Sequence, residues 1–204
     1  SMFNARQIID GVSLTKENEI GKKIAVPFLS ISDNGLHKSN IGSFLFDGEG
    51  TPTTKIDIIE GGVIKNFLHS EATARYFGVK PTGHAGLGSK VSVSTDWIII
   101  NKTHGIESLC PELNHQNYTD EFVLIEELNA LHSGIKASQG SFSLPFDGWL
   151  IKEGSKVSIE AATVAGDIKN LLLNIIGIEN EEIVTHNGIS PHIWINELSI
   201  TGEA

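Results

Sequence analysis

The chain has 204 residues, of which 40% are hydrophobic and 20% are charged, and this balance excludes a wholly disordered protein. The net charge of −10, from 15 basic and 25 acidic residues, disfavours nucleic-acid binding, because phosphate groups require clustered lysine and arginine. The single cysteine, Cys110, excludes an internal disulfide framework and fits a reducing compartment. No apolar run approaches the roughly 20 residues that span a bilayer, and no signal-peptide pattern is recognised, so we expect a cytoplasmic protein without a membrane partner.

The first predicted elements are a strand and a turn. Ser1-Met2 is interpreted as a cloning remnant, and residues 3–23 carry only a weak pattern. Residues Ile24–Ile31 predict a strand with Pro27 at an edge or a bulge. Asp33-Asn34-Gly35 follows as a predicted turn.

The stretch from residue 44 to residue 54 combines an apolar run with a tight turn. Phe44-Leu45-Phe46 predicts a short strand that buries one side. Asp47-Gly48-Glu49-Gly50 and Thr51-Pro52 predict a shaped turn, because glycine supplies positive φ, aspartate bonds its own backbone and proline fixes φ. The carboxylates of Asp47 and Glu49 could bind a cation or transfer protons, or Asp47 could bond backbone amides and fix the turn. The sequence favours the turn, since no third or fourth oxygen ligand stands nearby.

A hairpin and a short helix follow this turn. Lys55–Glu60 and Val63–Leu68 predict two strands, with Gly61-Gly62 at the reversal. Ser70 is expected to cap a helix that runs through Phe77 and stops at Gly78. Thr82-Gly83-His84-Ala85 then predicts a polar loop, which lacks the spaced glycines and the lysine of a phosphate-binding loop.

The middle of the chain predicts one strand and one helix. Asp96–Asn101 has the pattern of a buried strand bounded by polar residues. A helix is expected to start at Thr119 or Asp120 and to end at Gly134. Its apolar positions recur near the helical period: Phe122, Ile125, Leu128 and Leu131.

The last third predicts a second hairpin, a helix and a terminal strand. Phe142–Phe146 and Trp149–Ile159 form the predicted hairpin, which turns at Glu153-Gly154. Asp167–Ile176 predicts an amphipathic helix with Gly177 as its stop, and Ile193–Ile200 alternates as a strand. The sum is one β-rich α+β domain over residues 1–204, with a strongly twisted or barrel-like, mainly antiparallel sheet and about three helices.

The stretch FDGEGTPTTKIDIIEGGVIKNFLHSEATARYFGVKPTGHA, residues 46–85, resembles the signature of the TldD/PmbA family, whose members were once named modulators of DNA gyrase. PmbA is also called TldE. The last motif carries His84 where the family usually has Asn. The family resemblance assigns a structural signature to Asp47, Gly48, Glu49, Gly50, Pro52, Arg75, Thr82 and Gly83. The acidity of the chain gives no support to the gyrase name.

The resemblance implies a zinc site elsewhere rather than in this chain. Family members are about twice as long, so the sequence resembles a C-terminal half. TldD-like members carry His-Glu-x-x-x-His in the other half and a cysteine late in the C-terminal domain. The matching stretch here, residues 183–192, has no cysteine, and no such histidine motif occurs in the 204 residues. The resemblance therefore points to the PmbA/TldE-like side, with zinc in a TldD-like partner, no cofactor in this chain, and His186 and His192 as the only candidate ligands.

Cys110 offers a second kind of chemistry. With His104 or His115 as a base it could act as a thiol nucleophile, or it could be a structural cysteine. A nucleophile needs its base within hydrogen-bond reach and a third group that orients the base, and this loop sequence specifies neither. The structural interpretation is therefore favoured, and no catalytic residue is predicted.

Two functions remain open from the sequence. The resemblance implies a subunit domain that does not bind metal, in a TldD/TldE-type metallopeptidase complex that acts on unfolded peptides, in peptide maturation or antitoxin turnover. Such a chain would not be catalytic alone, and its partners would be a TldD-like subunit or a second copy, together with an unfolded peptide. The alternative is a non-enzymatic, β-rich module that binds proteins or peptides.

Overall fold

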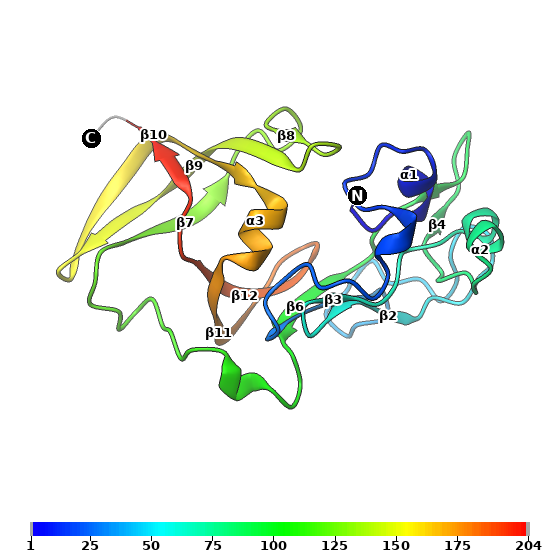
Figure 1. Ribbon diagram of the computed structural model, residues 1–204, viewed down its shortest axis with the longest axis horizontal. Helices are drawn as coiled ribbons and strands as arrows, with labels where there is room; N and C mark the ends of the chain where they lie inside the picture. Colours follow the sequence, from blue (N-terminus) through cyan, green and yellow to red (C-terminus); the bar gives the residue numbers. More distant parts are fainter. Residues whose placement is uncertain (1, 203–204) are drawn as a thin grey trace.

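A computed structural model describes residues 2–202 and shows two open sheets, a two-stranded ribbon and three α-helices. In Figure 1 the second sheet lies on the left, the first sheet runs toward the right, and helix α3 (Ile168–Leu173) lies between them. Neither strand order closes on itself, so the sheets do not form a barrel. The predicted class, a β-rich α+β fold with mainly antiparallel strands, is confirmed. Within residues 2–202 no helix is long and apolar enough to cross a membrane.

The first sheet has six strands in the order β11-β12-β6-β1-β2-β3, and all of its pairs are antiparallel except β12 with β6. Its strands are β1 (Leu29–Asn34), β2 (Lys55–Glu60), β3 (Val63–Ile64), β6 (Ile98–Lys102), β11 (Ile175–Val184) and β12 (Gly188–Ile195). The predicted hairpin with Gly61-Gly62 at the reversal is confirmed as β2 and β3. The predicted strand near residue 98 is confirmed as β6.

The second sheet has the order β13-β10-β9-β7, with β8 paired to the start of β9. Its strands are β7 (Phe122–Leu128), β8 (Ile135–Lys136), β9 (Ser141–Lys152), β10 (Ser155–Asp167) and β13 (Ser199–Thr201). The predicted turn at Glu153-Gly154 is confirmed, and both residues have positive φ, as a two-residue hairpin loop requires. The ribbon consists of β4 (Ala85–Gly86) and β5 (Ser92–Val93).

Three α-helices and two short 3-10 helices complete the described chain. They are α1 (Ala5–Ile9), α2 (Glu71–Phe77), α3, and the 3-10 turns Glu17–Glu19 and Glu107–Leu109. Helix α2 begins and ends as predicted, because the Ser70 side chain accepts a hydrogen bond from the backbone of Thr73 and Gly78 takes the left-handed conformation.

The helix predicted from about residue 119 to residue 133 is wrong: Phe122–Leu128 is strand β7. Its backbone pairs antiparallel with β9, from Phe122 opposite Ile151 to Leu128 opposite Phe146. Four consecutive apolar residues, 122–125, satisfy a helical and a strand period equally, and pairing with a long neighbouring strand decides between them.

Two predictions near the C-terminus are corrected in their boundaries. Helix α3 ends at Leu173, and the chain continues directly as β11, so Gly177 lies inside a strand rather than at a helix stop. The predicted terminal strand is two strands, because β12 belongs to the first sheet and β13 pairs with β10 of the second. The chain therefore passes from the first sheet to the second between β12 and β13.

Two predictions near the N-terminus also change. The strand expected from Ile24 begins only at Leu29 and runs to Asn34, so Asp33 and Asn34 lie in β1 and not in a turn. Phe44, Leu45 and Phe46 were expected to bury one side of a strand, but they are 57–72% exposed and lie outside the sheets. The core is instead built by β1, β2, α3 and β11, with a separate cluster inside the second sheet around Leu144 and Phe146.

Candidate functional site

Asp47 joins the turn of the signature segment to the loop at residues 82–85. Its Oδ1 accepts hydrogen bonds from the backbone N–H groups of Glu49 and Thr51, both at 2.9 Å. Its Oδ2 accepts one from the N–H of Ala85 at 3.0 Å. The backbone N–H of Gly48 in turn donates to the carbonyl oxygen of Ala85 at 2.7 Å. The turn and the loop are therefore one framework.

Glu49 ties the same turn to helix α2. Its Oε2 accepts a hydrogen bond at 2.8 Å from the N–H of Glu71, the first residue of the helix. A carboxylate at this position also suits the positive end of the helix backbone. Both carboxylates of the signature are thus engaged with backbone amides, and neither belongs to a group of converging metal-ligand atoms within residues 2–202.

Gly83 allows the loop to lie directly against the turn. A Cβ atom at this position would stand 2.5 Å from the carbonyl oxygen of Pro52, and its φ of +77° lies in the left-handed region. A side chain here would separate the two segments. Of the other signature residues, Gly50 has a φ of +84° in the turn, and Arg75 is exposed on α2 with no side-chain hydrogen bond or ion pair within residues 2–202.

The Thr82 hydroxyl organises the interior of the loop. It donates to the carbonyl oxygen of His69 at 3.2 Å and accepts from the N–H of His69 at 2.7 Å. It also lies 2.9 Å from Nδ1 of His84. Burial of His69, and then the neighbouring His84, lower the pKa of its imidazole to about 4, so that His69 is neutral at pH 7.

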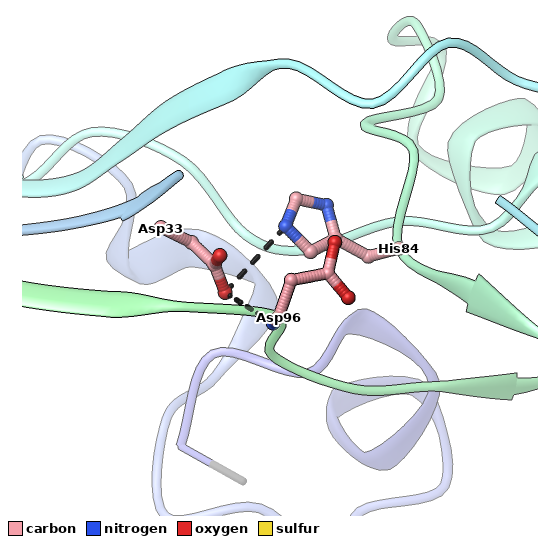
Figure 2. A group of neighbouring side chains, drawn as sticks. All are labelled: Asp33, His84 and Asp96. Atoms are coloured by element: carbon pink, nitrogen blue, oxygen red, sulfur yellow. Dashed lines mark hydrogen bonds and ion pairs between the residues drawn. The ribbon is translucent and has the colours of Figure 1, made fainter. Parts of the chain in front are cut away.

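His84 points at two carboxylates that come from distant parts of the chain. Figure 2 shows the ring facing Asp33, at the end of β1, with Asp96, just before β6, beside them. Nε2 of His84 lies 3.6 Å from Oδ2 of Asp33, and both side chains are fully buried. One ligand atom from each of the three residues lies within 4.8 Å of the others.

The backbone holds Asp33 in place. Its Oδ2 accepts the N–H of Asp96 and its Oδ1 accepts the N–H of Trp97, both at 2.9 Å. Asp96 is exposed at one side, but the pKa of its carboxyl group is raised. Burial is the largest cause, and the nearby Asp33 and Asp47 carboxylates act in the same direction, whereas His84 lowers the pKa. Negative charge is therefore concentrated beside the imidazole.

A second buried carboxylate, Glu179 on β11, lies at the other side of the first sheet. It accepts the N–H of His115 at 2.7 Å, Nδ1 of His115 at 2.9 Å and Nε1 of Trp194 at 2.9 Å. Burial raises the pKa of this carboxyl group, but the hydrogen bonds from His115 and Trp194 lower it more, so that its pKa is below the ordinary value. This is a fully satisfied acid, fixed by its donors.

The histidines and the cysteine singled out from the sequence lie apart. His186 is exposed and bonds the side chain of Asn187, whereas His192 packs on the ring of His115 at 4.3 Å between centroids. Cys110 is buried, and its sulfur accepts the N–H of Ile178 at 3.2 Å. His104 is exposed and bonds Glu107.

These placements bear on two of the expected chemistries. Within residues 2–202 the sulfur of Cys110 bonds the backbone of Pro111 and Ile178, and no hydrogen bond joins it to His104 or His115. His186 and His192 belong to no group of three ligand atoms in this part of the chain. The donor set expected for the family's zinc, a cysteine late in the domain, is therefore not supplied by these residues.

An exposed apolar loop adjoins the signature turn. We use "the 41–46 loop" for residues 41–46, in which Ile41, Phe44, Leu45 and Phe46 are 104%, 72%, 72% and 57% exposed. The backbone N–H of Thr53 donates to the carbonyl oxygen of Leu45, so the loop is attached to the turn. Exposed apolar side chains close together in the chain are a feature of surfaces that bind a protein, a membrane or a ligand.

Comparisons with known proteins agree on one family. Residues 1–202 match the family described as "PmbA/TldA metallopeptidase C-terminal domain". The metalloprotease PmbA of Escherichia coli O157:H7 is 26% identical over 91% of this chain and 38% of its own length. A TldD metalloprotease homologue of Buchnera aphidicola is 43% identical, but over only 33% of this chain and 14% of its own length.

Solved structures share the fold. A Thermotoga maritima protein named as a candidate modulator of a DNA gyrase superposes with a TM-score of 0.85 at 28% identity, over 98% of this chain and 45% of that chain. TldE of Thermococcus kodakarensis superposes with a TM-score of 0.78 at 23% identity, over 98% and 46%. The chain spans less than half the length of the relatives it matches.

Proposed function

Because the chain belongs to the PmbA/TldD metallopeptidase family, whose C-terminal domain it matches over residues 1–202, we propose that it is the PmbA/TldE-like subunit domain of a TldD/TldE-type peptidase complex. In this role it lacks the family's zinc ligands and completes the assembly around a TldD-like subunit that holds the metal. It acts in the cytoplasm on unfolded peptides, in peptide maturation or antitoxin turnover.

The chemistry of the C-terminal segment supports the PmbA side. Residues 183–192 contain no cysteine, and the one thiol of the chain is bonded inside the core beside Ile178. Four relatives that each cover 86% or more of this chain are named PmbA or PmbA homologue, whereas the TldD homologue matches 33% of it. A thiolate is a zinc ligand of choice, and its absence removes one ligand of a three-ligand site.

The single observation that carries the proposal of a partner is the 41–46 loop. Its apolar side chains are exposed beside a turn that Asp47 and Glu49 hold rigidly against the 82–85 loop and helix α2. Large apolar side chains on a preorganised frame are the usual core of a subunit interface, because little conformational freedom is lost on binding. We infer that the signature segment is structural and presents this loop to the second subunit.

The second sheet offers a place for an extended peptide. Strand β7 is at the end of the strand order, so one side of its backbone is unpaired within residues 2–202. Leu128 of β7 also lines an apolar groove of about 720 Å³ that runs between the two sheets. An unfolded peptide can add to such an edge through main-chain hydrogen bonds without requiring one sequence.

The test is the association of the full-length polypeptide with its TldD-like partner. We expect one complex on size exclusion, and degradation of an unfolded peptide only while the partner's zinc motif is intact. Phe44→Ser with Leu45→Ser should dissociate the complex and leave the fold intact, because both side chains are exposed. Val157→Ser, at an exposed apolar position of the distant β9–β10 hairpin, is the matched control and should change neither property.

A polypeptide that stays monomeric with every such partner, or that cleaves peptides alone under strong chelation, contradicts the proposal. The first result would leave the alternative of a peptide-binding module.

A further inference from the structure

We propose that Asp33, His84 and Asp96 form a binding site for one divalent transition-metal ion of the zinc or manganese class. The site is independent of the proposed function, because it uses none of the positions at which TldD-like members hold zinc. It is also absent from the sequence expectations, since its two carboxylates lie 63 residues apart in the chain.

The geometry suits two atoms that share an ion better than two atoms that share a proton. The 3.6 Å between Nε2 of His84 and Oδ2 of Asp33 is longer than a hydrogen bond. Two ligands bound at about 2.0–2.2 Å to one ion stand roughly 3–3.5 Å apart. Asp96 is exposed and can turn its carboxylate toward the same point, and its open side admits an ion and water.

The contact with Thr82 leaves Nε2 as the ring nitrogen of His84 that faces Asp33. Nδ1 of His84 lies 2.9 Å from the Thr82 hydroxyl, and Nε2 lies on the side of Asp33. The proposed site uses the tautomer in which Nδ1–H donates to the Thr82 oxygen and the lone pair of Nε2 is directed at Asp33. An imidazole whose outer N–H is hydrogen-bonded in this way is the usual form of a metal ligand.

The burial of the unpartnered atom gives the site its second, independent support. Nε2 of His84 has no hydrogen-bond partner within residues 2–202, and its side chain is 0% exposed. A buried lone pair that faces a carboxylate is unfavourable on both sides. A cation between them removes the repulsion and compensates the charges of Asp33 and Asp96.

The donor set selects the class of metal. Imidazole nitrogen is a good ligand for zinc and for other first-row transition ions, whereas Mg²⁺ and Ca²⁺ prefer oxygen alone. One nitrogen with two carboxylates therefore favours Zn²⁺ over Mn²⁺, and Mn²⁺ over Mg²⁺. Such an ion would join the end of β1, the 82–85 loop and the segment before β6.

The experiment titrates the metal-free chain with Zn²⁺, Mn²⁺ and Mg²⁺ by calorimetry, with metal analysis after gel filtration. We expect one ion per chain, the order Zn²⁺, Mn²⁺, Mg²⁺, and a rise in Tm with Zn²⁺. His84→Asn introduces the residue that the family usually carries. His84→Asn and Asp96→Asn should each weaken Zn²⁺ binding by more than about tenfold, because even the loss of a residue that only supports a metal ligand has an effect of this size.

Exposed residues of the same types provide the controls. His104→Asn and Asp57→Asn should leave Zn²⁺ binding unchanged, because His104 is 104% exposed and Asp57 lies on the surface. Circular dichroism verifies that each variant is folded. The proposal is wrong if the wild-type chain is not saturated at millimolar Zn²⁺ and Mn²⁺. It is also wrong if His84→Asn and Asp96→Asn both still bind the ion as the wild type does.

A protonated His84 that forms an ion pair with Asp33 is the rival arrangement. It would appear as a wild-type chain that binds neither metal while His84 carries protons on both ring nitrogens in NMR spectra. That result also overturns the proposal. None of these measurements requires a partner subunit, so the outcome is separate from that of the peptidase complex.

Discussion

Two buried carboxylates of this protein lie beside a histidine ring, and their surroundings differ. Glu179 accepts three hydrogen bonds shorter than 3 Å from His115 and Trp194, and within residues 2–202 its own carboxylate is not among the buried side chains without a partner. Asp33 faces His84 at 3.6 Å, with a second carboxylate beside it and an unpartnered Nε2. A carboxylate and an imidazole therefore make two different contacts. We call Glu179 and His115 the closed pair, because they are hydrogen-bonded to each other, and Asp33 and His84 the open pair, because Nε2 of His84 has no hydrogen-bond partner.

The difference shows what a buried ionisable pair can be used for. A fully satisfied pair fixes segments, here β11 to the loop at residue 115 and to β12, and has no capacity for a ligand. An unsatisfied pair stores an unfavourable interaction that a ligand can relieve. The comparison predicts that the free energy of unfolding depends on Glu179 and His115, and that metal binding depends on Asp33 and His84.

The largest expected effect is at the closed pair. Glu179→Ala should lower the free energy of unfolding by about 3 kcal/mol, because it removes a buried carboxylate and leaves partly buried donors of His115 and Trp194 with no acceptor. Urea unfolding followed by tryptophan fluorescence measures the loss. Glu181→Ala, on the exposed part of the same strand, is the control and should change the value by less than about 0.5 kcal/mol. Equal effects of the two changes would remove the distinction between the regions.

Asp47 sharpens the comparison, because this carboxylate lies in the region of the open cluster but accepts three backbone N–H groups and faces no unpartnered ring nitrogen. Asp47→Ala should cost about 2 kcal/mol, since the N–H groups of Glu49, Thr51 and Ala85 lose their acceptor. Asp57→Ala is the matched change, and the surface ion pair of Asp57 with Lys55 contributes less than about 1 kcal/mol. If Asp47→Ala were as mild as Asp57→Ala, the signature turn would not depend on its aspartate.

Local signals in the sequence were sufficient for much of the fold. The Gly61-Gly62 reversal, the Ser70 cap with Gly78, and the Glu153-Gly154 turn are each determined within a few residues. Phe122–Leu128 was not, because its apolar run fits two periods and only the partner strand β9 decides between them. The prediction for Phe44–Phe46 failed for another reason: a short apolar run does not by itself show that its side chains are buried, and these three are 57–72% exposed.

The candidate site could be predicted only in part. Asp47 and Glu49 were found because a motif and its hydrogen bonds are close in sequence. Asp33 was interpreted as a turn residue and Asp96 as a strand boundary, and nothing near either one indicates the other. Their meeting depends on the pairing of β1 with β6, which no local pattern encodes. The only sequence signal was His84 itself, a histidine where the family usually carries asparagine.

Lowering the pH should reduce the stabilisation by Glu179 less than the Glu179→Ala substitution does. The pKa of Glu179 is below its ordinary value, so its contribution to stability is complete above the unfolded-state pKa, about 4.3, and is lost as the pH falls through the folded-state pKa. The loss is smaller than for Glu179→Ala because a protonated carboxyl group still accepts hydrogen bonds. Unfolding free energies of the wild type and of Glu179→Gln, measured from neutral pH to below this range, should converge. Parallel pH profiles would show that the acid is not stabilised by its donors.

The smallest expected effect on stability is at the open pair, and it completes the comparison. His84→Asn should change the unfolding free energy of the metal-free chain by less than about 1 kcal/mol, because an asparagine amide can donate to Thr82 and the unpartnered Nε2 disappears. His115→Asn removes a ring nitrogen that Glu179 uses, so it should cost more, by about 1–2 kcal/mol. Added Zn²⁺ should raise the Tm of the wild type and of His115→Asn but not that of His84→Asn, because mass action stabilises only a folded state that binds the ion. Melting curves of the three proteins with and without Zn²⁺ measure both halves of this prediction. A large loss for metal-free His84→Asn would show that His84 is already satisfied in the fold, and the two pairs would then be alike.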